Sequence, residues 1–500
     1  MLKLTLDKGI KMRLKTVKLT HFRGYRSSTI LPIDSAMTGI VARNDYGKST
    51  VLEALAIFFD SADIKPDKSD MNCFSLTEGH DKFEITCEFD DLPENLVLDE
   101  NVQTSLSQEF LLNVEGGFEV VKTFKASTGK HDGTAIRCQH PADKALASLL
   151  SLKIADLKKL GEQFGVTDQV ADQRVASQWR QAIRSAAGDV SCQETLLDVG
   201  KGLSTEAKSI WEKIEMLLPT FALFKADRES SDGDAEAKNP LQLAVKEAQA
   251  ALQAQISELE RQIESSVLDV AERTLDKLRE MAPDLANELT PRFKDKPKWT
   301  FNFTLEGENG IPINKRGSGV RRLILLNFFR AEAEKNAVVG SPRNVIYAIE
   351  EPETSQHPNY QMMLMKALLE LSIQTNRQII VTTHVPALAG LIPIEGIRYV
   401  TRDENGIPIV KMPSPQVLKE AAESLGVLPE TGMERAKGVV LVEGKSDVLF
   451  LRHVSNILKA GGHLQASLED AGIVPILIGG CGSVKHWVTL NLADDLGLPW

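Results

Sequence analysis

Cysteine is scarce in this chain, with only five residues in a sequence of 500. They are scattered, at positions 73, 87, 138, 192 and 481, and no two form a Cys-x-x-Cys pair. This spacing argues against a disulfide framework and against a zinc site built on paired cysteines. It is typical of reduced thiols, so we expect a cytoplasmic protein.

Long apolar runs and excess positive charge are also missing. No stretch of about 18 apolar residues occurs, so we expect no membrane span, and the first residues lack the apolar core of a signal peptide. The net charge of −11 argues against non-specific coating of nucleic acid, although it allows a local basic groove and suits divalent metals. A chain of this length and ordinary composition predicts about two to four domains.

One stretch carries a strong motif for phosphate binding. Residues 42–50 read Ala-Arg-Asn-Asp-Tyr-Gly-Lys-Ser-Thr, with a short apolar strand before them and an apolar helical run after them. Backbone N–H groups of such a loop and of the helix start attract phosphate oxygens, the lysine reaches the β- and γ-phosphates, and the serine hydroxyl ligates Mg²⁺. Ala42 replaces the first glycine of the motif. The candidate nucleotide contacts here are Asn44, Gly47, Lys48, Ser49 and Thr50.

Three later stretches carry polar residues next to apolar segments. Gly317-Ser318-Gly319 precedes an apolar helix, the apolar strand 345–349 ends in Glu350-Glu351-Pro352-Glu353, and the apolar strand 378–383 ends in His384. Apolar strands with polar tips are typical of a parallel sheet that binds a ligand at the carboxyl ends of its strands. Each motif is weak alone, since such loops, solvated carboxylates and structural histidines are common.

The remaining pattern predicts strands, helices and an arm. Residues 13–19 alternate as an edge strand does, 83–89 and 118–124 predict two further strands, and 142–220 lean helical. In the stretch 241–290, Val245, Leu252 and Leu259 recur every seven residues, as do Ile256, Ile263 and Val270. These heptads predict a coiled coil or helical hairpin arm. A long helix packed on the domain is an equal alternative, because Gln249 and Ser266 interrupt the pattern.

The order of the four nucleotide motifs resembles the ABC-type ATPase head of the RecF, SMC and overcoming-lysogenization-defect (OLD) families. The resemblance covers residues 13–60 and 300–400, with the arm inserted between them. It implies ATP and Mg²⁺ as cofactors, DNA as a partner, and two heads that sandwich nucleotide in a homodimer or a higher even-numbered assembly. The Glu-Pro-Glu run and His357-Pro358 match the tail typical of OLD-like ATPases.

The same resemblance implies a role for each matching residue. Glu350 holds Mg²⁺ through water, and Glu351 polarises the attacking water. His384 senses the γ-phosphate, and Ser318 with Gly319 caps the γ-phosphate of the partner subunit. Arg23 occupies the position where relatives contact the nucleotide.

A second catalytic element begins near residue 437. The strand 438–442 leads to Glu443, a glycine turn and Asp447 at the start of a helix, and a second strand at 473–478 leads to a glycine-rich loop. This arrangement resembles the opening of a TOPRIM nuclease domain, although one more α/β unit is the simpler interpretation. The resemblance implies that Glu443 and Asp447 ligate Mg²⁺ or Mn²⁺ for phosphodiester cleavage.

The TOPRIM pattern also requires an Asp-x-Asp strand, and Trp500 falls about where that strand should begin. We therefore expect the rest of the domain beyond residue 500; a degenerate domain is the alternative. An ATPase head followed by TOPRIM is the arrangement of OLD-family nucleases, including those of Gabija and retron anti-phage systems, which act with partner proteins or with an RNA/DNA component. A RecF/SMC-like DNA-repair ATPase and an ATP-gated scaffold or sensor with a separate effector are the alternatives.

The predicted fold class is therefore α/β: an ABC-type ATPase head with an inserted helical or coiled-coil arm, followed by a truncated TOPRIM domain. The predicted boundaries are 1–140 for the first lobe of the head, 141–295 for the helical insertion and dimerisation arm, 296–430 for the second lobe of the head, and 437–500 for the partial TOPRIM domain.

Overall fold

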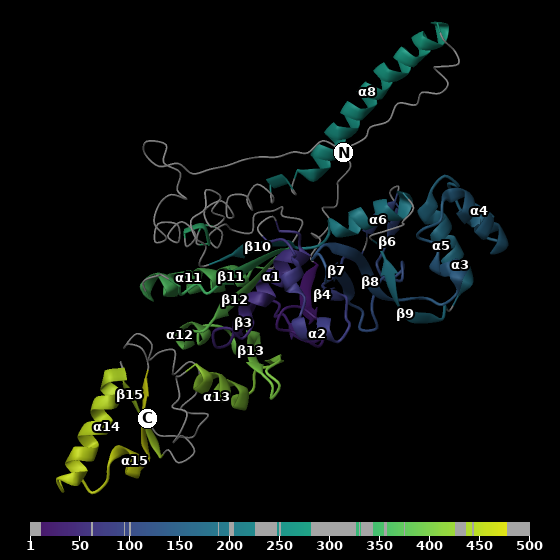
Figure 1. The fold of residues 1–500 in the computed structure, drawn as a ribbon. Helices are drawn as coiled ribbons and strands as arrows, with labels where there is room; N and C mark the ends of the chain where they lie inside the picture. Colours follow the sequence, from purple (N-terminus) through teal and green to yellow (C-terminus); the bar gives the residue numbers. More distant parts are fainter. Residues whose placement is uncertain are drawn as a thin grey trace, which may run out of the picture.

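The computed structural model describes residues 12–61, 64–94, 96–99, 102–188, 190–199, 205–225, 248–249, 252–281, 327–329, 331, 344–354, 358–374, 376–425, 437–442 and 445–477. Within them the fold is α/β, as predicted, with two large sheets and helices between and around them (Figure 1). No helix in these ranges is long and apolar enough to cross a membrane.

The first sheet is antiparallel, with the described strands in the order β2-β1-β4-β7-β8-β9. Its strands are β1 (Arg13–Thr20), β2 (Thr29–Pro32), β4 (Lys82–Asp90), β7 (Phe118–Lys125), β8 (His131–Pro141) and β9 (Cys192–Asp198). The strands predicted at 83–89 and 118–124 are confirmed. The prediction of an edge strand at 13–19 is wrong, because β1 pairs with both β2 and β4. An interior antiparallel strand with one covered face shows the same alternation as an edge strand.

The second sheet is mostly parallel and has the described strand order β10-β11-β12-β3-β13-β14. Its strands are β3 (Met37–Val41), β10 (Thr220–Phe224), β11 (Val345–Glu350), β12 (Arg377–Thr383), β13 (Ile397–Arg402) and β14 (Pro408–Lys411). Only the β13–β14 pair of this order is antiparallel. The strand before His384, β12, thus lies between β11, which precedes the glutamates, and β3, which precedes the phosphate-binding loop, within the kind of parallel sheet that the sequence predicted.

Helix α1 (Lys48–Phe58) lies between the two sheets, and its apolar residues are almost all buried (Figure 1). Alternate residues of the parallel strands face two different cores. Ile346, Ala348 and Ile380 pack on the α1 side, whereas Tyr347 and Val381 pack with α11 (Pro358–Ser372) on the other side. Both faces are therefore covered, which explains why these strands read as continuous apolar runs.

Buried side-chain amides join the sheets directly. Gln378 on β12 accepts a hydrogen bond from the Leu14 N–H through Oε1 and donates to the Leu14 carbonyl through Nε2, both at 2.9 Å. The Asn344 amide donates to the Met12 carbonyl at 2.8 Å. Because these donors and acceptors are buried and paired, they hold the two sheets in one relative position.

The range 142–220 is only partly helical. It contains α3 (Lys144–Ala147), α4 (Ile154–Gln163), α5 (Ala176–Ala187) and α6 (Thr205–Glu215), as predicted. It also supplies β9 to the antiparallel sheet and the start of β10 to the parallel sheet, which corrects the helical prediction. The short apolar run of β10 (Thr-Phe-Ala-Leu-Phe) has no periodicity that separates a buried strand from a buried helix segment. Of the Leu323–Phe329 helix, 327–329 are described and helical.

Helix α8 (Gln253–Met281) forms most of the predicted arm and extends away from the sheets in Figure 1. At 1.5 Å per residue it spans about 43 Å. Several of its apolar residues are exposed, with Leu259 and Ile263 each 47% and Val270 63% accessible, whereas Ile256 and Leu268 are half-buried. Among the described residues these exposures favour the projecting arm over the packed helix. Val245 and the predicted loop at 226–240 lie outside the described residues.

The segment after the head forms a β-α-β unit. Strand β15 (Gly438–Val442) and strand β16 (Ile473–Leu477) are parallel, and α14 (Lys445–Ala460) and the short α15 (Leu468–Ala471) connect them. This agrees with the two strands and the intervening helix predicted from the sequence. The remaining described elements are η1 (Lys68–Asp70), α2 (Cys73–Thr77), β5 (Leu96–Asp99), β6 (Val102–Thr104), η2 (Thr167–Gln169), α12 (Pro386–Ala389), η5 (Ile394–Gly396) and α13 (Pro415–Ser424).

Candidate nucleotide-binding site

The phosphate-binding loop joins β3 to α1 and turns through two left-handed residues. Asp45 has φ 64° and Gly47 has φ 93°. A side chain at Gly47 would also crowd Tyr25, because a Cβ there would lie 3.1 Å from the tyrosine Oη. Glycine is therefore required at this position for both conformation and space. No capping side chain accepts a hydrogen bond from the first N–H groups of α1.

Lys48 is the first residue of α1 and is only 4% exposed. Its Nζ donates to the carbonyls of Ala42 at 3.1 Å and Arg43 at 3.0 Å, and it lies 3.5 Å from Glu351 Oε1. The Lys48 ammonium group therefore links two carbonyls of the loop and faces the Glu351 carboxylate, which follows β11. A buried ammonium with these partners is placed to receive a phosphate anion.

The imidazole of His384 contacts two carboxylates, Glu351 and Glu353, and Glu351 is the one that approaches Lys48. His384 Nδ1 lies 3.2 Å from Glu351 Oε1 and 3.2 Å from Glu353 Oε1. Glu351 has φ 40°, and its N–H donates to Thr382 at the end of β12. Burial raises the pKa of the Glu353 carboxyl. The parallel pairing of β11 with β12 thus brings together the motifs that the sequence places far apart.

Arg23 belongs to a different cluster. Its guanidinium pairs with Asp70 at 2.8 Å and with Glu53 on α1, and Glu53 also pairs with Lys225. Burial alone would raise the pKa of Glu53, but the hydrogen bonds from Lys225 and Arg23 lower it. The arginine predicted to contact nucleotide is therefore engaged by two carboxylates in this structure.

The other predicted site residues have varied surroundings. Asn44 is exposed on the loop, Ser49 and Thr50 are half-buried in the first turn of α1, and Glu350 is half-buried at the end of β11. Asp447 is exposed in the first turn of α14. The predictions that lie outside the described residues are Ser318, Gly319, His357 and Glu443.

Two residues that contact the loop were not predicted as site residues. The Tyr25 hydroxyl donates to the Gly47 carbonyl at 3.2 Å. Arg402, at the end of β13, donates to the Asp45 carbonyl at 2.6 Å, and its guanidinium lies 5.0 Å from the centre of the Tyr46 ring. No local pattern marks Arg402, because its partner is 357 positions away in the sequence. These contacts stabilise a loop that has Ala42 in place of a glycine.

The residues present fit ATP and Mg²⁺. The uncapped start of α1 and Lys48 offer positive charge to phosphate groups, and Ser49 with Glu350 offers oxygen ligands. The described ranges contain no group of three or more acidic, histidine or cysteine side chains that could hold a metal by themselves. Mg²⁺ normally takes only one or two carboxylates and fills its other positions with phosphate oxygens and water, so this donor set suits it.

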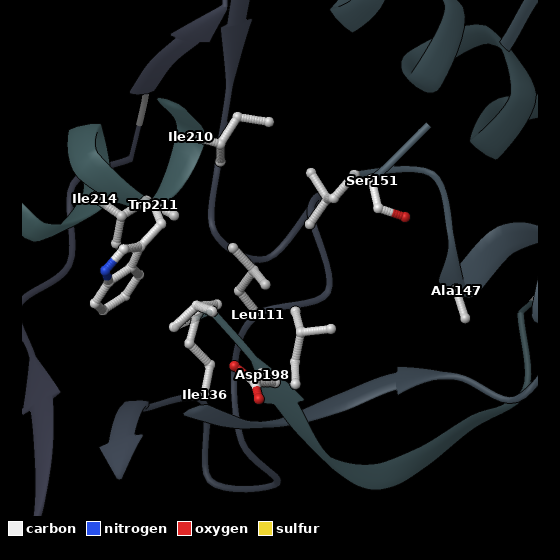
Figure 2. A pocket seen from close by; sticks show the side chains of 11 residues that line it. Leu111, Ile136, Ala147, Ser151, Asp198, Ile210, Trp211 and Ile214 are labelled. Atoms are coloured by element: carbon white, nitrogen blue, oxygen red, sulfur yellow. The ribbon is translucent and has the colours of Figure 1, made fainter. Parts of the chain in front are cut away.

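A separate cavity of about 60 Å³ lies where α6 meets the antiparallel sheet (Figure 2). Ile210, Trp211 and Ile214 of α6 line it with Leu111 and Ile136, as Figure 2 shows. The lining is largely apolar, with Asp198 and Ser151 as its polar side chains. None of these residues belongs to the cluster around Lys48, so we assign this cavity to packing rather than to catalysis.

A model of the AAA ATPase domain family matches residues 12–389. This range is more than half of the chain and contains the phosphate-binding loop, Glu351 and His384. The chain belongs to the AAA ATPase domain family. Membership agrees with the geometry around Lys48, and it identifies the head as an ATPase domain.

The OLD nuclease of Thermus scotoductus is a similar protein. It is 28% identical to this AAA ATPase domain protein over 154 residues, which cover 30% of this chain and 28% of the nuclease. The similarity therefore spans less than a third of either protein.

Two solved Smc heads match most of the chain at low identity. One is the Smc head bound to the C-winged helix domain of ScpA, with a TM-score of 0.38 and 11% identity over 81% of this chain and 99% of that chain. The other is an Smc head with an extended coiled coil bound to the C-terminal domain of ScpA, derived from Pyrococcus furiosus. Its TM-score is 0.37, with 12% identity over 83% of this chain and 100% of that chain.

Proposed function

We propose that the head binds ATP with Mg²⁺ and hydrolyses it at the cluster of Lys48, Glu351 and His384. The observation that carries this proposal is the 3.5 Å approach of Lys48 Nζ to Glu351 Oε1 at the carboxyl ends of β3 and β11. Lys48 and Glu351 therefore lie at the carboxyl end of the parallel sheet, where ligands bind in parallel α/β proteins.

Each residue has a distinct task in this proposal. Lys48 and the start of α1 bind the phosphates, and Glu351 orients the water and accepts its proton. His384 holds Glu351 through the Nδ1 contact, and Ser49 with Glu350 binds Mg²⁺. The metal ion neutralises negative charge on the phosphate oxygens when it is bound. Ser318 and Gly319 contact the nucleotide of a second head, so the working unit is an even-numbered homo-oligomer.

The test separates binding from turnover. Lys48→Ala should abolish binding of a fluorescent ATP analogue, because the charge that meets the phosphates is lost. Glu351→Gln should keep that binding and stop phosphate release, since an amide cannot accept the proton. ATP hydrolysis by Glu351→Gln at the wild-type rate would contradict the role of Glu351. Glu404→Gln, on an exposed turn after β13, is the matched control.

We further propose that ATP turnover regulates DNA cleavage by a metal-dependent TOPRIM site. Two observations support this: the parallel β15–α14–β16 unit follows the head, and the OLD nuclease is a relative. Glu443 follows β15 directly in the sequence, and Asp447 lies in the first turn of α14, so their carboxylates are candidates for Mg²⁺ or Mn²⁺. DNA is then the substrate, and an anti-phage defence role, with an additional protein or nucleic-acid component, is its biological setting.

A plasmid-nicking assay tests the nuclease proposal. The full-length gene product should nick DNA with Mg²⁺ or Mn²⁺, and Glu443→Ala should lose nicking but keep ATP hydrolysis, because the two sites belong to separate units. Equal nicking by both proteins would exclude the TOPRIM assignment. ATP hydrolysis without nicking by either protein would favour a scaffold with a separate effector or a repair ATPase.

A further inference from the structure

Glu353 is the most confined carboxylate of the nucleotide site. It lies two residues after Glu351, and its side chain is 5% exposed. One oxygen, Oε1, accepts hydrogen bonds from the Thr383 hydroxyl at 2.8 Å and from the His384 N–H at 3.1 Å. The Glu353 carbonyl accepts a further hydrogen bond from the Gln361 amide on α11 at 2.9 Å. The residue is therefore fixed from the end of β12 and from α11 at once.

A purely structural role does not account for this carboxylate. Within the described residues its second oxygen, Oε2, is buried without a hydrogen-bond partner, and no lysine or arginine pairs with Glu353. Burying a carboxyl group without a cationic partner is costly. A glutamine could accept the same two hydrogen bonds at lower cost, so a glutamate here indicates a function that needs the carboxylate.

The neighbouring group on which the Glu353 carboxylate can act is the His384 side chain. Its Nδ1 lies at the same distance, 3.2 Å, from Glu353 Oε1 and from Glu351 Oε1. A carboxylate oxygen accepts hydrogen bonds, so in the contact with Glu351 Oε1 the hydrogen lies on His384 Nδ1. Nδ1 forms its hydrogen bond with Glu351, and the Glu353 oxygen at the same distance adds negative charge beside that nitrogen, so both carboxylates favour the Nδ1–H form.

We propose that Glu353 is a positioning residue for ATP hydrolysis, which holds His384 in the Nδ1–H form so that the imidazole orients Glu351 beside Lys48. Glu353 acts through His384, whereas Lys48 and Glu351 act on the nucleotide and the water. The inference rests on the proposed ATP hydrolysis, and it adds a residue to which no role in that reaction has been assigned.

The test uses Glu353→Gln and Glu353→Ala in the full chain, with Glu404→Gln as the exposed control. Loss of a group that orients a catalytic ligand typically lowers activity about tenfold to a hundredfold. We expect kcat to fall about tenfold in Glu353→Gln and further in Glu353→Ala. KM and the Kd of a non-hydrolysable ATP analogue should change less than about twofold, because the contacts of Lys48 are untouched.

A second readout does not depend on turnover. In protein with ¹⁵N-labelled histidine, the His384 resonances, identified by their loss in His384→Gln, should report the Nδ1–H form in the wild type and a mixed population in Glu353→Ala. Unchanged His384 resonances and unchanged kcat in both variants would overturn the inference. A fall of kcat only in parallel with lost analogue binding or lost thermal stability would also overturn it. Absence of ATP hydrolysis in the wild type would instead reject the proposed function, while the resonances still test the positioning of His384.

Discussion

Lys48 Nζ lies 3.5 Å from Glu351 Oε1, although the two residues come from opposite ends of the family domain. The contact exists because β12 lies between β3 and β11, so that the loop after β3 and the turn after β11 open at the same edge of the sheet. In this structure Lys48 is satisfied by two loop carbonyls and one carboxylate. In the proposed ATPase site, phosphate would compete with Glu351 for the ammonium, which would couple nucleotide binding to the position of the carboxylate that we propose as the base.

Arg402 is expected to strengthen ATP binding without touching the nucleotide. It holds the Asp45 carbonyl, and Asp45 has the left-handed conformation that the loop requires. Because an exposed hydrogen bond contributes about 1 kcal/mol, Arg402→Ala should raise the Kd for ATP about fivefold. Isothermal titration with an ATP analogue measures this change.

The control for Arg402 is Arg261→Ala, which removes an exposed arginine of α8 that pairs only locally with Glu258. It should leave the Kd for ATP unchanged. An equal Kd in Arg402→Ala and wild type would show that Tyr25 and the start of α1 hold the loop without Arg402.

A buried ionic cluster should determine the stability of the region around α5. Glu109 is 2% exposed and pairs with Arg184 and Arg180 of α5. Although burial alone would raise the pKa of Glu109, the hydrogen bond from Arg184 lowers it below the usual value of 4.5. Glu109→Gln should lower the free energy of unfolding at pH 7 by about 3 kcal/mol, because the buried Arg180 and the half-buried Arg184 lose their carboxylate.

The pH dependence of this effect has a definite sign. A carboxylate with a lowered pKa contributes stability above its unfolded pKa and loses it as the pH falls through the folded value. The difference in unfolding free energy between wild type and Glu109→Gln should therefore be largest near neutral pH and shrink below about pH 4.5. Asp172→Asn, which removes the exposed pair with Arg174, is the control and should leave the free energy of unfolding nearly unchanged. A constant difference across this pH range would contradict the ionic explanation.

Self-association should depend on ATP. If Ser318 caps the nucleotide of a second head, Glu351→Gln with ATP and Mg²⁺ should accumulate a species of twice the 55.0 kDa chain mass or a higher even multiple. Sedimentation velocity with and without ATP measures this. A monomer under both conditions would contradict the sandwich of two heads.

The exposed stripe of α8 offers a second, independent contact. Replacing Leu259 and Ile263 with glutamate should weaken association through the arm, because both side chains are 47% exposed and apolar. ATP binding by the head should stay unchanged, since α8 extends away from the sheets (Figure 1). Unaltered association in this variant would restrict the interface to the heads.

The sequence by itself determined the parts of this protein that depend on local patterns. The strand, loop and helix around Lys48 follow from glycine placement and apolar periodicity, and the polar tips of β11 and β12 predicted a shared edge for Glu351 and His384. The heptads of α8 predicted its helix. These features depend on residues that are neighbours in the chain, so a short window of sequence contains the physical information.

Only the tertiary structure decided which partners those elements take. Alternation in β1 reports a buried face but not whether a strand has one neighbour or two, and the apolar run of β10 does not say which sheet it joins. The shared contact of His384 with Glu351 and Glu353, and the contact of Arg402 with Asp45, arise from strand order and chain packing. Such contacts join residues far apart in the sequence, and no local periodicity specifies their distance or direction.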